Sequence, residues 1–232
     1  MKKVAVLFNK FLVIFFSLGG VFLSMLMAQK DGYSGWSKRL MYFTGQSNLW
    51  IGFTQVFLVT ALLSKREKYL EKLYFLRYIF TVAITVTGIV FCGLLGPNAD
   101  ESYRPWSLSS IMTHALSPAF AIVDFFVDRR KIRLSVKSVG SALIAPGLYT
   151  TVASVLCLLG VDFGRGEAFP YFFMNYFSPA GVFGFSKRMP YIIGSFYWIA
   201  MLVIIIVAVA VLYAYLSGIE LKNPRKSVTG NA

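Results

Sequence analysis

Charged side chains are scarce in this sequence of 232 residues, because Asp, Glu, Lys and Arg together make up only 14% of it. A soluble domain usually carries about a quarter charged residues. Hydrophobic residues reach 57%, aromatic residues 17%, and the mean hydropathy is +0.65. This composition argues against an ordinary soluble domain and indicates a membrane protein.

Residues that bind metals or carry redox chemistry are also few. The chain has one histidine, His114, and two cysteines, Cys92 and Cys157. The sequence contains neither a cluster with metal-ligand spacing nor a phosphate-binding glycine loop. We therefore expect no metal and no cofactor. We interpret the cysteines as packing residues and leave open whether they pair.

Acidic residues are outnumbered, with 10 Asp and Glu against 23 Lys and Arg, which gives a formal net charge of +13. This excess does not indicate nucleic-acid binding, because the basic residues are spread over short loops instead of being gathered in one domain. We expect them to contact anionic lipid headgroups at the cytoplasmic face.

Six apolar runs are each close to the ~20 residues that cross a ~30 Å hydrocarbon layer. They lie at 8–28, 44–63, 74–95, 110–127, 139–159 and 192–216. We predict an all-α polytopic bundle with six transmembrane helices over residues 1–219, followed by a disordered cytoplasmic tail at 220–232. We interpret the first run as a retained span and not as a signal peptide.

Basic residues are distributed unequally between the two sides of these predicted spans. Sixteen of the 23 lie at the N-terminus, after the second span, after the fourth span or in the tail, and this count includes Lys10 and Arg77. The positive-inside rule then predicts that both termini are cytoplasmic, as an even number of spans requires. The predicted location is the cell membrane, with multiple passes.

The start of the second run carries a polar face. Thr44, Ser47 and Asn48 are spaced at i, i+3 and i+4, so a helix presents them on one side, and Gln55 returns to that side. Polar groups at membrane depth must face protein or trapped water. Gly45 within this stretch suggests the close approach of another backbone or of a ligand.

The fourth run contains His114, and Pro118 four residues later predicts a kink there because proline cannot donate to the carbonyl of residue 114. The second and fourth runs cross in the same direction, so Thr44 and His114 are expected at a common depth near the outer side. Ser117 and Asp124 lie near the same helical face. Asp124 is ~15 Å deeper, and we expect it to pair with a basic residue after the span, Arg129 or Arg130.

Two further segments are candidates for the surroundings of this site. The fifth run contains a Pro146-Gly147 break followed by Tyr149, and such a break is tolerated where it lines protein or a cavity. The stretch 169–177, which includes Asn175 and Tyr176, is too apolar for a solvated loop and too short to span. We predict a re-entrant or interfacial segment that covers the site.

A hydroxyl nucleophile needs a base within hydrogen-bond reach, and neutral histidine serves near pH 7. Each residue alone also has a structural interpretation. Threonines in membrane helices often bond to their own backbone carbonyls, and a lone histidine can simply join two helices. Thr44 and His114 together indicate a catalytic site more strongly than either residue does alone.

A short set of residues resembles a known family: the pattern F-T-x-x-S-N at Phe43, Thr44, Ser47 and Asn48, then His114 with Pro118, and Pro170-Tyr171-Phe172. They are similar to the androgen-induced-gene / androgen-dependent-TFPI-regulating protein family, and more closely to its bacterial relatives. The resemblance implies a six-helix intramembrane hydrolase, here in the bacterial inner membrane. Animal members cleave fatty acid esters of hydroxy fatty acids, and the residues between and after the two motifs depart from the animal pattern. The resemblance makes Thr44 the expected nucleophile and His114 the expected base.

The sequence thus predicts a membrane-embedded esterase that takes a lipid ester from the bilayer. The expected supporting or oxyanion-stabilising groups are Ser47, Asn48 and Gly45, and the pocket candidates are Gln55, Ser117, Tyr149, Asn175 and Tyr176. Two alternatives stay open at this point. One is a proton-coupled transporter that uses His114 and Asp124, and the other is a non-catalytic lipid-binding protein.

Overall fold

The computed structural model of the chain describes residues 2–98, 105–128 and 136–216. Within these ranges the structure is helical, apart from loops and one isolated bridge between Phe185 and Ile193. The predicted tail at 220–232 lies outside the described residues. So do Arg129 and Arg130, which we expect to pair with Asp124.

Several of the long helical rods are built from more than one segment, some of them joined by π-helical turns. The elements in chain order are α1 (Lys2–Ile14), the π-helix η1 (Phe15–Gly19), α2 (Gly20–Met27), the 3₁₀-helix η2 (Trp36–Met41), α3 (Phe43–Leu63), α4 (Glu67–Val90), the π-helix η3 (Phe91–Leu95), α5 (Leu108–Ile111), the π-helix η4 (Met112–Leu116), α6 (Ser117–Val127), α7 (Val136–Ser141), α8 (Ile144–Leu158), the 3₁₀-helix η5 (Phe172–Met174) and α9 (Ser195–Leu216).

Five helical stretches of the described chain are long and apolar enough to cross a membrane. They are Val4–Met27, Glu67–Leu95, Leu108–Val127, Ser138–Leu158 and Ser195–Leu216. The predicted second span corresponds to α3, which has 21 residues but is not among the five. Its polar side chains, among them Ser47, Asn48 and Gln55, lower its hydropathy and are buried inside the protein.

The assignment of Lys10 and Arg77 to the cytoplasmic flanks is wrong. Both residues fall inside the predicted runs 8–28 and 74–95, and in the structure they belong to α1 and α4. Their side chains are buried, at 0% and 1% exposure. They do not belong to a loop that faces lipid headgroups.

The predicted break at Pro146-Gly147 lies earlier in the chain, at Ala142 and Leu143 between α7 and α8. Pro146 falls in the first turn of α8. A proline is tolerated there because the first N–H groups of a helix have no carbonyl partner within it.

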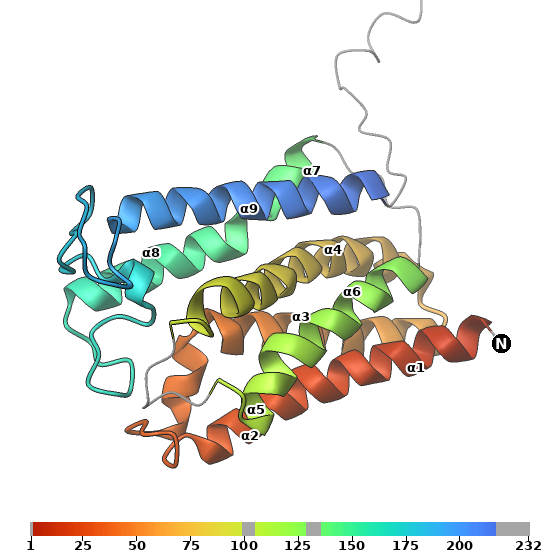
Figure 1. Cartoon of the computed structure of the whole chain (residues 1–232). Coiled ribbons are helices and arrows are strands. Elements are labelled where there is room, and N and C mark those ends of the chain that lie inside the picture. The colour runs from red at the N-terminus through yellow and green to blue at the C-terminus, as the bar shows by residue number, and fades with distance from the viewer. Residues whose placement is uncertain (1, 99–104, 129–135, 217–232) are drawn as a thin grey trace, which may run out of the picture.

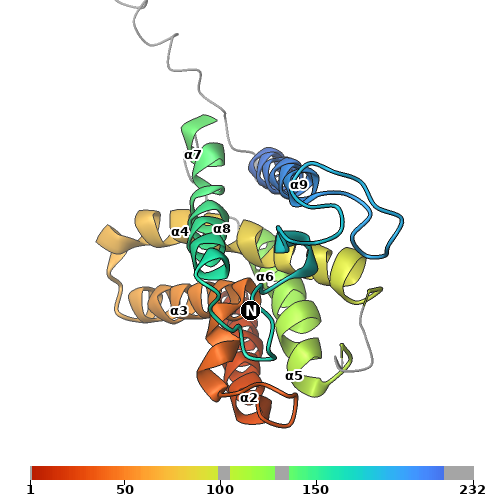
Figure 2. The same cartoon turned by 90° about the vertical axis from the view of Figure 1, so that its left-hand side faces the viewer.

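Helix α4 is the centre of the bundle and packs against α3, α6 and α9, while α1 packs against α3 and α6. Figures 1 and 2 agree in showing α4 between α9 on one side and α3 with α6 on the other. The loops 28–42 and 159–194 gather at one end of the bundle, where α3 begins (Figure 1). We call this end the loop end.

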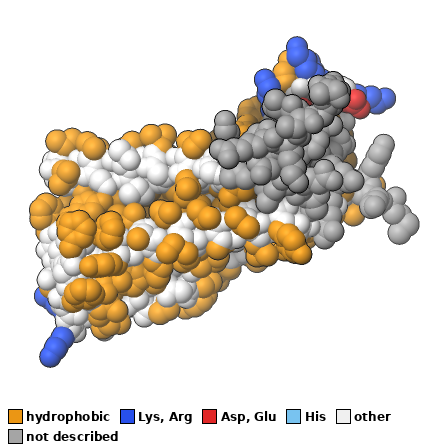
Figure 3. All heavy atoms as spheres, turned by 90° about the horizontal axis from the view of Figure 1, so that it is seen from above, with side chains coloured by type: hydrophobic (Ala, Val, Ile, Leu, Met, Phe, Trp, Pro, Cys, Tyr) orange, Lys and Arg blue, Asp and Glu red, His pale blue; other side chains and the backbone are white. Residues whose placement is uncertain are grey.

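The sides of the bundle expose large apolar side chains, for example Phe22 at 63% and Ile204 at 68% exposure. On the face seen in Figure 3, orange apolar side chains cover the flank of the molecule, and the visible Lys and Arg side chains lie toward its two ends. An apolar flank between charged ends is compatible with a multi-pass membrane protein.

Candidate active site

Thr44 and His114 lie in direct contact at the loop end of the bundle. The Oγ1 atom of Thr44 is 3.1 Å from Nε2 of His114. Thr44 belongs to the first turn of α3, and His114 belongs to the π-helix η4, seventy residues further along the chain. Both side chains are partly exposed, so a ligand can reach them.

The second ring nitrogen of His114 determines which nitrogen is free to act. Nδ1 lies 3.0 Å from the backbone carbonyl oxygen of Ser110, which can only accept a hydrogen bond. Nδ1 therefore carries the proton and donates it to this carbonyl, and Nε2 keeps its lone pair for the hydroxyl of Thr44. The hydroxyls of Ser110 and Thr113 also lie near Nδ1, at 3.1 and 3.2 Å.

The local helix geometry around His114 follows from Pro118. The N–H of Ser117 donates to the carbonyl of Met112 in a π-helical turn, so the Thr113 carbonyl loses the partner that it has in an α-helix. The Nδ2 group of Asn48 donates to that Thr113 carbonyl over 3.0 Å. The disturbance that we expected from Pro118 thus takes the form of a π-turn, and its free carbonyl binds α3.

Aromatic packing holds the imidazole from the other side. The ring of Phe91, in η3, stacks on His114 with a centroid distance of 4.2 Å and an interplanar angle of 20°. Phe91 is itself 1% exposed. A stacked ring and a hydrogen bond to Ser110 together fix the plane of the imidazole.

A polar cavity of about 400 Å³ opens beside the Thr44–His114 pair. Its wall includes both residues, and also Arg39, Arg165 and Tyr42 from the loops. Burial raises the pKa of the Tyr42 phenol well above its usual value, with a further contribution from Tyr33, so Tyr42 remains a neutral hydroxyl. The predicted cover is partly present, since Phe169, Pro170, Tyr171 and Phe172 from the stretch 169–177 line this cavity.

A second, apolar cavity of about 290 Å³ also has Thr44 in its wall, together with residues of α3, α4, α8 and α9. Its lining includes Val86, Leu143, Leu202 and Ile206. Thr44 lines both cavities, whereas His114 is part of the polar wall only. Thr44 is therefore a residue at which a polar and an apolar space meet.

The residues expected to support Thr44 have different surroundings. Nδ2 of Asn48 donates both to the carbonyl of Thr44, at 2.8 Å, and to that of Thr113, and Ser47 bonds to Thr87 at 3.0 Å. Both side chains are fully buried and already hydrogen-bonded. Gly45 lines the polar cavity and follows Thr44 in the first turn of α3, where backbone N–H groups have no partner within the helix.

Of the pocket candidates, Tyr149 lines the apolar cavity, and Ser117 is buried without lining either cavity. Asn175 and Tyr176 are not in either wall. Oδ1 of Asn175 accepts from the N–H of Phe177, and the hydroxyl of Tyr176 bonds to Ser154, so these contacts shape the loop and fasten it to α8. The two cysteines are free, with Cys92 exposed and Cys157 buried.

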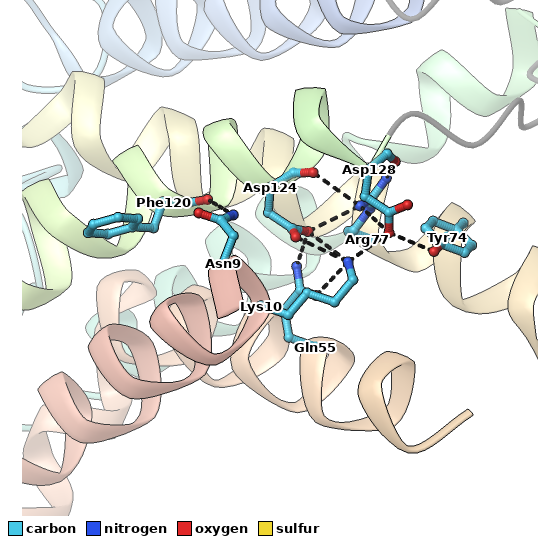
Figure 4. A network of polar contacts seen from close by, with 8 residues as sticks. All are labelled: Asn9, Lys10, Gln55, Tyr74, Arg77, Phe120, Asp124 and Asp128. Atoms are coloured by element: carbon cyan, nitrogen blue, oxygen red, sulfur yellow. Dashed lines mark hydrogen bonds and ion pairs between the residues drawn. The ribbon is translucent and has the colours of Figure 1, made fainter. Parts of the chain in front are cut away.

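The remaining pocket candidate, Gln55, belongs to a buried ion cluster that sequence reasoning missed, formed by Lys10, Gln55, Tyr74, Arg77, Asp124 and Asp128 (Figure 4). Nζ of Lys10 is 3.1 Å from Asp124 and 2.9 Å from Asp128. Nη1 of Arg77 lies 3.1 Å from Asp124, and Gln55 donates to the same carboxylate at 2.7 Å.

The ion cluster balances its own charges, because two basic side chains meet two carboxylates. It connects α1, α3, α4 and the end of α6. One sequence signal pointed to it: Lys10, Gln55 and Asp124 are polar residues inside apolar runs, and such residues face the bundle interior and pair with one another. The loop assignment of Lys10 and Arg77 concealed the partners.

Comparisons with known proteins give no family for this chain, since no family model, curated protein or solved structure matches it.

Proposed function

We propose that this chain is a membrane-embedded ester hydrolase that acts on lipid esters, with Thr44 as nucleophile and His114 as general base. The observation that carries the proposal is the 3.1 Å contact between Oγ1 of Thr44 and the unprotonated Nε2 of His114, at the edge of two cavities. A nucleophile, a base and a group that orients the base are the elements of hydroxyl-based acyl transfer, and the Ser110 carbonyl is the orienting group.

In the first half of the proposed reaction, Oγ1 of Thr44 bonds to the ester carbonyl carbon while its proton moves to Nε2. When the tetrahedral intermediate collapses, the bond to the alcohol oxygen breaks and this oxygen takes the proton from Nε2. An acyl-threonine remains. A water molecule then gives a proton to Nε2 and its oxygen to the acyl carbon, and Thr44 regains the proton as the carboxylic acid leaves.

The negative oxygen of the intermediate needs hydrogen-bond donors, each worth about 3–4 kcal/mol in comparable enzymes. Asn48 and Ser47 are committed to other partners, and the backbone N–H groups of Thr44 and Gln46 donate to the Tyr171 hydroxyl and the Tyr42 carbonyl. The N–H of Gly45, in the same first turn of α3, is therefore the better candidate. The helix dipole adds positive charge at this end. The hydroxyl of Tyr171, 3.4 Å from the Thr44 nitrogen, is a second candidate.

The finer features of membrane insertion belong to the same proposal. We infer that α3 crosses the membrane as a sixth span, with both termini in the cytoplasm and the loop end outside. The resemblance in Thr44, Ser47, Asn48 and His114 to the androgen-induced-gene / androgen-dependent-TFPI-regulating family supports a hydrolase on lipid substrates.

The ion cluster makes the transporter alternative less favourable. That reading required Asp124 to exchange protons with a path from His114. Asp124 is instead fully buried and held by Lys10, Arg77 and Gln55.

The test is hydrolysis of p-nitrophenyl octanoate by the purified full-length protein in detergent. Wild type should release nitrophenol, and Thr44→Ala and His114→Ala should each reduce kcat/KM by about a thousandfold. Thr60→Ala is the matched control, because Thr60 is an exposed threonine of the same helix that bonds only to the Val56 carbonyl. Equal rates in all four proteins would refute the proposal and favour a non-catalytic lipid-binding role.

A further inference from the structure

We infer that the substrate is an ester of an apolar acyl chain with a polar alcohol, and that the two parts occupy different cavities. The acyl chain lies in the apolar cavity between α4, α8 and α9, and the alcohol lies in the polar cavity beneath the loops. This inference rests on the proposed hydrolase function and specifies its substrate class.

Thr44 belongs to the walls of both cavities. Among the described residues, the two cavities share only Thr44, Leu95 and Tyr171 in their walls. An ester carbon bonded to Oγ1 of Thr44 has two substituents, the acyl chain and the alcohol oxygen. Because Thr44 lines both cavities, these two substituents can extend into different surroundings.

The position of His114 decides which part of the ester occupies which cavity. His114 lines the polar cavity and is absent from the wall of the apolar one. In the proposed reaction Nε2 must return its proton to the oxygen of the leaving alcohol, so this oxygen must lie on the same side as the imidazole. The alcohol therefore occupies the polar cavity, and the acyl chain occupies the apolar one.

The shape of the apolar cavity fits a chain. Along α9 it is lined by Ile199, Leu202, Val203 and Ile206, which corresponds to about 10 Å of helix at ~1.5 Å per residue. Its opposite walls are formed by Val86 and Val90 of α4 and by residues at the start of α8. Transfer of a hydrocarbon chain into such a space removes apolar surface from water.

The apolar cavity also reaches the outer flank of the bundle. Gly147 on α8 and Val203 on α9 both line it, and both are exposed, Val203 at 41%. These residues belong to two of the five stretches that are apolar enough to cross a membrane. A long acyl chain can therefore enter from the lipid side and can extend beyond the cavity.

The polar cavity combines charged and hydroxyl groups with apolar and aromatic side chains. Its wall contains Arg39, Arg165, Asp31 and Glu167, and the hydroxyl groups of several serines and tyrosines. Arg39 is paired with Asp31, and Arg165 donates to the Asp31 carbonyl. Such a wall offers more hydrogen-bonding groups to the hydroxyl groups of an alcohol than the wall of the apolar cavity does.

Three esters test the assignment on the wild-type protein in detergent. The first is 1-oleoylglycerol, with a long acyl chain and a polar alcohol. The second is oleyl acetate, in which the polarity of the two parts is reversed. The third is glyceryl monobutyrate, with a short acyl chain. We expect kcat/KM for 1-oleoylglycerol to exceed that for oleyl acetate by about tenfold or more.

Two substitutions test the apolar cavity itself. Val203→Phe and Gly147→Phe add an aromatic ring at its walls, and an added Cβ at Gly147 meets no atom within 4 Å. Each should lower the ratio of kcat/KM for 1-oleoylglycerol over glyceryl monobutyrate by about tenfold. The controls are Ile204→Phe, on the same helix but outside both cavities, and Gly140→Phe, also an exposed helical glycine with open space around it. Neither control should change this ratio.

The outcomes separate the two proposals. If the wild type hydrolyses none of the three esters, the hydrolase proposal and this inference both fail. If it hydrolyses them but favours oleyl acetate, or if the two cavity variants keep the wild-type ratio, the hydrolase stands and the substrate assignment is overturned.

Discussion

The side-chain amide of Asn48 donates to the backbone carbonyl of Thr113 over 3.0 Å, and in doing so it connects the helix of the nucleophile to the π-turn of the base. The same amide also donates to the carbonyl of Thr44. One buried side chain thus contacts the backbone at Thr44 and the residue directly before His114. This arrangement makes Asn48 a positioning residue.

Replacing Asn48 should therefore damage both stability and activity. In Asn48→Ala the buried Thr113 carbonyl loses its partner, which costs about 1–3 kcal/mol of unfolding free energy. A small displacement of η4 from α3 should reduce kcat about a hundredfold. Thermal unfolding and ester hydrolysis in detergent measure the two effects. Gln46→Ala is the control, since Gln46 donates only to the Leu40 carbonyl in the preceding loop; an equal loss in both variants would argue against the positioning role.

Two adjacent glycines give a test of the packing between α2 and η4. A Cβ at Gly20 would lie 2.9 Å from Cγ2 of Thr113 and 3.0 Å from Cβ of Met112, whereas at Gly19 it would meet only the end of the Met112 side chain at 3.6 Å. Gly20→Ala should destabilise the protein by about 1–3 kcal/mol and slow hydrolysis, because it pushes η4 away.

The neighbouring substitution Gly19→Ala should be neutral or should stabilise the protein by up to about 1 kcal/mol, since alanine is the better helix former. Melting temperatures of the two variants, measured side by side, check the prediction. If Gly19→Ala is the more harmful of the two, the described contact between α2 and η4 is wrong.

The ion cluster predicts an unusual response to removal of charge. Lys10→Met leaves Asp124 and Asp128 with Arg77 as their only cationic partner in the cluster, and we expect a loss of about 3–5 kcal/mol. The same substitution at Lys38 should cost less, about 1–2 kcal/mol, because its nitrogen lies 4.0 Å from the partly exposed Asp162 carboxylate and also donates to the Asp162 backbone carbonyl.

The double variant Lys10→Met with Asp124→Asn restores the charge balance and keeps an acceptor for Gln55. It should recover part of the lost stability, as measured by denaturant or thermal unfolding. A double variant less stable than Lys10→Met alone would contradict the view that charge balance holds the cluster together.

The sequence predicted the features that depend on local patterns better than those that depend on contacts between helices. Long apolar runs predicted the helices well, because hydrophobicity over ~20 residues is a local property. Thr44 and His114 were matched by depth, since two helices that cross in the same direction can be compared residue by residue. The π-turn at Met112–Leu116 was foreseen only as a disturbance caused by Pro118.

The remaining features depend on tertiary contacts that no local pattern encodes. Lys10 and Arg77 resembled flanking residues because each follows other basic residues, such as Lys3 and Lys72, within a few turns of helix, but their partners lie on other helices. Gln55 shares a helical face with Thr44 by angle, yet it is eleven residues deeper and meets Asp124 instead of the cavities. Helical periodicity predicted which side of α3 carries Thr44 and Gln55. It did not predict which residues of other helices each side chain contacts.

The central claim is that Thr44 and His114 act together on an ester, and a double-mutant cycle on kcat/KM tests it most directly. Wild type, Thr44→Ala, His114→Ala and the double variant are compared with p-nitrophenyl octanoate. If the two residues form one catalytic unit, the double variant is no slower than either single variant, because removing one partner already disables the other. Losses that multiply in the double variant, or single variants as active as wild type, would contradict the account.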